Sequence, residues 1–64
     1  MKQGLVIDIN KKNQNMIAVK EDNGPLLMVT VDDTLGHDLN KLIGKKIKYS
    51  RYRDPSGNLR ITFL

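Results

Sequence analysis

Apolar and β-branched residues occur along the chain in short runs, separated by clusters of turn-forming residues. Alternation of apolar and polar side chains with a period of two marks these runs as strands, and no helical period competes over most of the length. The predicted strands cover residues 4–10, 15–21, 25–31, 45–53 and 58–64. The pattern therefore predicts a small all-β barrel or sandwich.

The first predicted strand is apolar on both faces. Leu5, Ile7 and Ile9 follow the alternation, but Val6 adds an apolar side chain to the opposite face, and Gly4 precedes the run. This composition suits a long, bent barrel strand whose two halves serve different sheets, with glycine at the bend.

The tripeptide Asp22-Asn23-Gly24 separates the second and third strands. It fits a three-residue hairpin loop, a type I turn followed by Gly24 in the left-handed conformation. Such a loop fixes the register of the two strands. The predicted pairs are Ile17 with Val29 and Val19 with Leu27 on the core side, and Ala18 with Met28 and Met16 with Thr30 on the outside.

A second turn signal, DPSG at residues 54–57, lies between the last two strands. It places aspartate first, proline second and glycine last, as a type I turn prefers. The same loop rule predicts the pairs Tyr49 with Phe63, Ser50 with Thr62, Arg51 with Ile61 and Tyr52 with Arg60.

Residues 32–44 are the one stretch without a strand pattern. Asp38 could cap a helix of one or two turns that contains Leu39 and Leu42 and closes at Gly44, and a packed loop is the alternative.

The order of the elements predicts the fold. Three hairpin-linked strands, a connection of about a dozen residues and two more strands follow the order of an OB-fold, a five-stranded Greek-key barrel. An SH3-like barrel with the same strand count and another connectivity is the alternative.

Length and composition limit the function. The 64 residues predict a single domain, residues 1–64, with a small core. There is no cysteine and a single histidine, His37, so we expect no disulfide, no metal site and no cofactor. No nucleophile, base or metal set stands at a catalytic spacing, so we do not expect an enzyme.

The sequence also bears on localisation. No apolar run approaches the roughly 20 residues of a membrane span, and Met1–Gly4 leads into a strand without a signal-peptide core. These features predict a cytoplasmic protein with no membrane partner.

Charge is unevenly distributed along the chain. Residues 1–40 carry four basic and six acidic side chains (net −2), whereas residues 41–64 carry seven basic and one acidic (net +6). A dense basic cluster is typical of a polyanion partner, because neutralised phosphates release their counterions. The alternative is a solvated edge strand, on which lysine blocks aggregation.

Two segments carry a resemblance to a known family. The heptapeptide Gly4–Asn10 (GLVIDIN) resembles the G-x-V-x-x-Φ-N opening of bacterial cold-shock domains, and Leu42–Tyr49, followed by a glycine turn and an apolar strand, looks like that family's ending. The resemblance implies an OB-fold that binds single-stranded RNA or DNA by stacking bases on aromatic side chains. This chain departs from the family there, because the expected stacking positions hold Met16, Ala18, Met28 and Thr30, and Asp8 replaces a tryptophan.

The first candidate surface is basic. Phosphate contacts are expected from lysine and arginine, with Tyr52 as the single stacking residue, giving weakly sequence-selective binding of single-stranded RNA or DNA. The outward face predicted for the last two strands holds Lys46, Lys48, Ser50, Tyr52, Arg60 and Thr62, with Arg51 and Arg53 near the rim of the barrel. The expected contact residues are Lys46, Lys48, Arg51, Tyr52, Arg53 and Arg60. Lys11, Lys12 and Lys20 extend this track if the folded barrel brings them to the same side.

The second candidate surface is aliphatic. Met16, Ala18 and Met28, with Leu26, form an outward stripe, and methionine-rich exposed patches are typical of surfaces that bind protein, including a second copy of the same chain. A protein-interaction or homodimerising barrel is therefore the alternative function. A third reading is that residues 32–44 or another strand cover the stripe, which would make it ordinary core.

Overall fold

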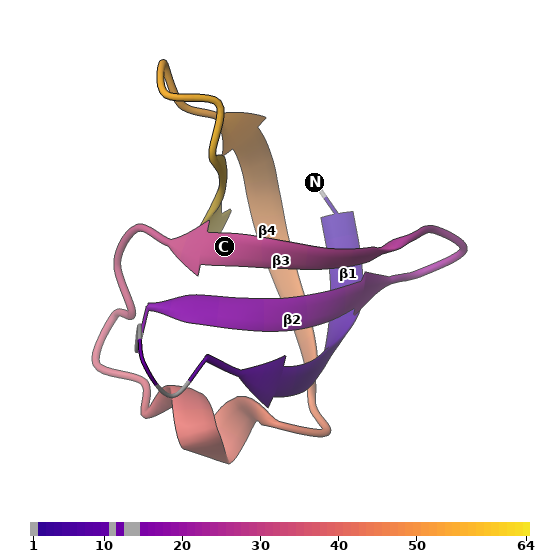
Figure 1. The fold of residues 1–64 in the computed structure, drawn as a ribbon. Coiled ribbons are helices and arrows are strands. Elements are labelled where there is room, and N and C mark those ends of the chain that lie inside the picture. The colour runs from indigo at the N-terminus through magenta and orange to yellow at the C-terminus, as the bar shows by residue number, and fades with distance from the viewer. Residues whose placement is uncertain (1, 11, 13–14) are drawn as a thin grey trace.

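The computed structural model, which describes residues 2–10, 12 and 15–64, is a closed barrel of five strands (Figure 1). One turn of 3₁₀ helix, η1, lies between the third and fourth strands. The elements are β1 (Lys2–Ile9), β2 (Met16–Glu21), β3 (Leu26–Val31), η1 (Leu39–Leu42), β4 (Lys46–Arg53) and β5 (Leu59–Phe63). The predicted all-β barrel with a short helical turn in the long connection is confirmed.

The strands follow one another around the barrel in the order β1-β2-β3-β5-β4. β3 pairs with β5 in parallel, and β1 closes the barrel by pairing with β4 antiparallel. Because β5 lies between β3 and β4, the connection through η1 passes over the end of the barrel and enters β4 on the far side of β5, in Greek-key fashion. This connectivity is that of the OB-like barrel and not of the SH3-like alternative.

Both hairpins have the predicted register. All eight predicted pairs occur, four between β2 and β3 and four between β4 and β5. One detail of the first loop is wrong: the left-handed residue is Asn23, with φ 56°, and not Gly24. Asparagine tolerates this conformation, and the register follows from the three-residue length of the loop. In the second loop Gly57 has φ 86°, as expected at its position.

β1 pairs with both β2 and β4, which agrees with the prediction of a long barrel strand whose two halves serve different sheets. Its first half pairs with β4 and most of its length pairs with β2, with a bulge between Val6 and Asp8. Gly4 lies where three strands meet. A Cβ atom there would lie 2.5 Å from Val19 Cγ1 and 2.9 Å from the Lys20 carbonyl oxygen, so the close approach of β2 requires glycine.

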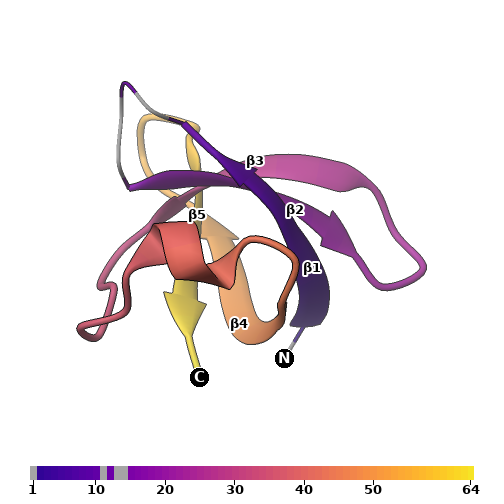
Figure 2. The same ribbon diagram turned by 90° about the horizontal axis from the view of Figure 1, so that it is seen from below.

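The core is formed by the inward side chains of all five strands and by Leu39 from η1. Its buried members are Val6, Ile17, Val19, Val29, Val31, Leu39, Tyr49, Ile61 and Phe63. η1 lies across one end of the barrel (Figure 2). Asp38 caps it by accepting a hydrogen bond from the Asn40 backbone N–H at 3.0 Å. Within the described residues, no helix has the length and apolar character to cross a bilayer.

Candidate nucleic-acid interface

The outer face of β4 and β5 carries most of the predicted basic surface. Alternation along β4 turns Tyr49 into the core and leaves the even-numbered positions from Lys46 to Tyr52 outside. Arg60 and Thr62 on β5 stand opposite Tyr52 and Ser50. The predicted set of outward residues on these two strands is therefore confirmed as one face, which we call the β4–β5 face: Lys46, Lys48, Ser50, Tyr52, Arg60 and Thr62.

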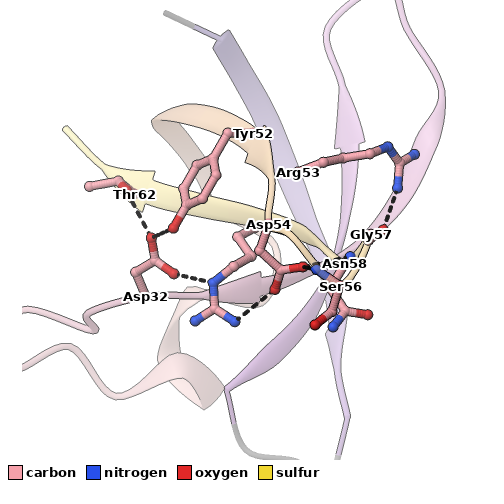
Figure 3. A network of polar contacts seen from close by, with 9 residues as sticks. Asp32, Tyr52, Arg53, Asp54, Ser56, Gly57, Asn58 and Thr62 are labelled. Carbon is pink, nitrogen blue, oxygen red and sulfur yellow. Dashed lines mark hydrogen bonds and ion pairs between the residues drawn. The ribbon is translucent and has the colours of Figure 1, made fainter.

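Asp32, the residue directly after β3, organises one end of the β4–β5 face. Its carboxylate accepts hydrogen bonds from the Tyr52 hydroxyl, from Arg60 Nε at 2.5 Å and from Thr62 Oγ1 at 3.2 Å. In Figure 3 the Tyr52 and Thr62 side chains reach toward this carboxylate from β4 and β5. Arg60 Nη1 also lies 3.6 Å from Asp54 Oδ2. The Tyr52 ring is thus anchored at its hydroxyl while 45% of the residue stays exposed.

These contacts set the protonation states at the Asp32 end. The hydrogen bond from Tyr52, supported by Arg60, lowers the pKa of the Asp32 carboxyl below its usual value. The same hydrogen bond raises the pKa of Tyr52, and the hydrogen bond to Asp32 raises the pKa of Arg60. At neutral pH the group therefore consists of a carboxylate, a guanidinium and a neutral phenol, with an aromatic ring beside a fixed cation.

Arg51 pairs with Ile61 as predicted, and its side chain is engaged with an acidic residue. It stands opposite the inward-facing Ile61, and its Nε lies 3.0 Å from Oε2 of Glu21, which is only 5% exposed. The same Oε2 accepts a hydrogen bond of 2.7 Å from the buried Tyr49 hydroxyl. Arg51 therefore compensates a buried carboxylate at one end of the barrel, and its head group is already engaged.

The other predicted cations differ in how far they are engaged. Lys46 Nζ lies 2.5 Å from Oδ1 of Asp22, in a pair that is largely exposed. Arg53 donates from Nη1 to the Gly57 carbonyl at 2.8 Å, within its own hairpin. In the described part of the chain, no carboxylate pairs with Lys48 or Arg53. Exposed ion pairs contribute little stability, so Lys46 can exchange its partner at low cost.

The three further lysines fall in different places. Lys20 lies outside on β2 beside Leu5, which pairs with Lys46 on its other side, so a row of outward residues connects the two lysines. Lys20 Nζ donates to the backbone carbonyls of Glu21, at 3.0 Å, and of the hairpin loop. Lys12 is exposed in the loop between β1 and β2, and Lys11 lies outside the described residues.

The aliphatic stripe is open to solvent and adjoins the β4–β5 face. Leu26 and Met28 are 61% and 51% exposed, and Met16 and Ala18 are partly buried beside them. η1 lies across the end of the barrel (Figure 2) and packs Leu39 and Leu42 against the core, while Leu26 and Met28 stay exposed. Strand pairing connects the two surfaces residue by residue: Met16 pairs with Thr30, Thr30 with Arg60, and Arg60 with Tyr52. The two predicted surfaces are thus neighbours on one outer wall.

Sequence reasoning missed the roles of two acidic residues, Glu21 and Asp32, that bind side chains of β4 and β5. Alternation from Ile17 and Val19 places Glu21 on the inner side, and the predicted pairing of Arg51 with Ile61 places Arg51 there too, so the sequence held the signal for their ion pair. Asp32 gave no such signal, because its partners are supplied by the parallel pairing of β3 with β5, between residues far apart in sequence.

Comparison with protein-family models, curated proteins and solved structures finds no match to this chain. Within the described residues, no three acidic or histidine side chains are grouped as a metal site would require. What the chain can bind therefore has to be inferred from the outer wall of the barrel itself.

Proposed function

We propose that this OB-like barrel is a non-catalytic module that binds single-stranded RNA or DNA with weak sequence selectivity through its β4–β5 face. The observation that carries the proposal is the half-exposed Tyr52 ring, anchored to Asp32 at its hydroxyl and held beside Arg60. A ring fixed in place before binding loses little conformational entropy when a base stacks on it.

Stacking can occur at only one aromatic residue of this chain. The sequence contains two tyrosines, one phenylalanine and no tryptophan, and Tyr49 and Phe63 are only 0% and 9% exposed. Each stacked base is worth about 1–3 kcal/mol, so one platform gives modest affinity and phosphate contacts must supply the rest. This is consistent with the resemblance to cold-shock domains in fold and with a departure from that family in where the bases stack.

Phosphate contacts come from cations distributed along β4 and its neighbour. Lys46, Lys48 and Tyr52 recur at even positions on one side of the strand, so they follow a line about 20 Å long, at 3.3 Å per residue. Arg60 retains donors beyond those bound to Asp32 and Asp54, since a guanidinium has five N–H groups. Phosphate contacts carry no base information, which accounts for the weak selectivity.

Fluorescence polarisation of labelled eight-nucleotide RNA and DNA, titrated at low and moderate salt, tests the proposal. Binding should weaken as the salt concentration rises. The double variant Lys48→Ala/Arg53→Ala should bind roughly tenfold more weakly than the wild type. Its plot of log binding constant against log salt concentration should be shallower by about 1.4, at about 0.7 per lost phosphate contact. Tyr52→Leu should weaken binding at every salt concentration without changing the slope.

The control is a variant with the same change in net charge. Lys2→Ala/Lys41→Ala removes two exposed cations that are not among the outward residues of β4 and β5, because Lys2 on β1 pairs with the inward-facing Tyr49 and Lys41 lies in η1. It should bind within about twofold of the wild type. Equal losses of affinity in the two double variants would mean that binding depends only on the net charge of the protein. No binding at low salt would overturn the proposal.

A second candidate function rests on the exposure of the aliphatic stripe. Leu26 and Met28 offer a polarisable apolar surface on β2 and β3 that could bind a protein or a second copy of this chain. Sedimentation velocity at increasing concentration tests the homodimer directly. A concentration-dependent dimer that Met28→Asp abolishes and Lys48→Ala leaves intact would support this function over nucleic-acid binding, and a monomer throughout would count against it.

A further inference from the structure

A hollow of about 370 Å³ opens beside the Met16 end of the cross-strand row Met16–Thr30–Arg60–Tyr52. It lies between the ends of β1 and β2 and the segment that leads into η1, and its volume is within the range of small-ligand sites. Its floor is apolar and its rim is polar. The lining residues are Ile9, Asn15, Thr34, His37, Asp38, Leu39 and Asn40.

The hollow is close to the proposed binding face. Asn15 directly precedes Met16, the first residue of the row that ends at Tyr52, and its carbonyl accepts a hydrogen bond of 2.7 Å from the Val31 N–H. Thr34 follows Asp32, the anchor of Tyr52, by two residues, so their Cα atoms lie within about 7.6 Å. A single strand that stacks one base on Tyr52 and runs along this row toward Met16 therefore reaches the hollow.

The chemistry of the rim favours a base over a phosphate. Among the residues that the structure describes, no lysine or arginine lines the hollow, and Asp38 does. Asp38 Oδ1 accepts hydrogen bonds from Asn40, from the backbone N–H at 3.0 Å and from Nδ2 at 3.4 Å, while Oδ2 accepts none from the described residues. A charged acceptor with spare capacity repels phosphate and binds N–H donors.

We propose that this hollow receives one base of the bound strand and prefers guanine, with Asp38 as the specificity-determining residue. Guanine carries two adjacent N–H donor groups, at N1 and N2, on its Watson–Crick edge, and the two lone pairs of Asp38 Oδ2 can accept from both, since Oδ1 is taken by Asn40. Uracil offers a single donor between two carbonyl acceptors. Ile9 and Leu39 supply the apolar floor against which a flat ring packs. The inference rests on the proposed function and adds to it a single point of base selection.

Fluorescence polarisation with a series of octamers tests this inference, in RNA or DNA according to which binds. One octamer contains only uracil or thymine, and the others carry one guanine at each position in turn. The best-placed guanine should tighten binding roughly tenfold, as one good bidentate base contact does. Hypoxanthine at the same position lacks the N2 amino group and should lose most of that gain.

Asp38→Asn is the matched variant, because asparagine caps helices about as well as aspartate but presents a donor in place of one acceptor oxygen. It should lose the guanine preference and bind the uracil or thymine octamer within twofold of the wild type. Circular dichroism melting shows whether the variant folds. If the variant does not fold, NMR of the wild type gives a second readout. The backbone amide signals of Thr34 and Asn40 should shift with the guanine octamer and not with the guanine-free one.

The outcomes separate the two proposals. Binding of all octamers with equal affinity would overturn the guanine site and leave the nucleic-acid function standing. A guanine preference that persists in a folded Asp38→Asn variant would overturn the role of Asp38. No binding of any octamer would overturn both.

Discussion

Three carboxylates hold most of the cations that the sequence assigns to phosphate binding. Asp32 binds Arg60 and Tyr52, Asp22 binds Lys46, and Glu21 binds Arg51. These pairs are not equivalent, because Asp22 is 39% exposed at its side chain and Glu21 only 6%. A bound phosphate can therefore replace Asp22 as the partner of Lys46, whereas Arg51 has to stay beside Glu21 to compensate its buried charge.

Arg51→Ala should destabilise the fold more than it affects the β4–β5 face. The substitution leaves Glu21 buried without its charge partner, and losing a hydrogen bond to a charged group typically costs about 1.5–3 kcal/mol of unfolding free energy. Urea unfolding measures this loss. Arg53→Ala on the same strand, whose partner is an exposed carbonyl, is the control and should stay within about 0.5 kcal/mol of the wild type. Equal stabilities of the two variants would contradict a structural role for Arg51.

Tyr49 makes stability depend on pH in the alkaline range. Burial, followed by the hydrogen bond to Glu21, raises the pKa of Tyr49 well above its ordinary value. The unfolded chain then releases the tyrosine proton near pH 10 while the folded chain retains it, so the unfolding free energy falls as pH rises above about 10.

Urea midpoints measured between pH 8 and pH 11 test this dependence. The wild type should lose stability relative to Tyr49→Phe as pH increases, by at most about 1.4 kcal/mol per pH unit, because one proton is involved. Parallel curves for the two proteins would show that Tyr49 does not titrate differently on folding.

At the scale of elements, the weakest junction of the barrel is the seam between β3 and β5. Only two residue pairs form it, Thr30 with Arg60 and Val31 with Ile61, and the Asp32 N–H extends it by donating to the Ile61 carbonyl at 3.0 Å. The β1–β2 and β2–β3 junctions have five pairs each. The side-chain contacts of Asp32 with β4 and β5 therefore reinforce the junction with the fewest backbone pairs.

Hydrogen exchange should detect this difference. The Asp32 amide, which is bonded across the seam, should exchange faster than the amides in the middle of β2, because local opening needs fewer hydrogen bonds to break. Asp32→Asn removes the charge that holds Arg60 and should speed seam exchange further while leaving the β2–β3 hairpin unchanged. Uniform protection around the barrel would contradict a weak seam.

The same distinction between local and distant pairing explains what the sequence could predict. Both hairpin registers follow from three-residue loops and alternation, and both were correct even where the left-handed residue of the first loop was Asn23 and not Gly24. The Asp32 cluster could not be predicted, because its members come together only through the β3–β5 pairing and the precise end of β3. The hollow beside η1 was missed for the same reason, since it joins the ends of separate elements.

At the scale of the whole molecule, folding brings the two halves of the charge distribution into contact. Residues 41–64 carry a net +6 and residues 1–40 a net −2, and Asp22, Glu21 and Asp32 from the first half pair with cations of the second. The remaining excess of positive charge favours polyanions and predicts binding that weakens with salt. The outer wall thus combines a charged face, one exposed aromatic ring and an adjoining aliphatic stripe.

The central claim is that single-stranded nucleic acid binds on the β4–β5 face, and an NMR titration of the isotope-labelled protein with an unlabelled octamer at low salt tests it most directly. The largest backbone amide shifts should fall on Lys48, Ser50, Tyr52, Arg60 and Thr62. Shifts confined to Leu26 and Met28 on the aliphatic stripe, or no shifts at millimolar octamer, would contradict the claim.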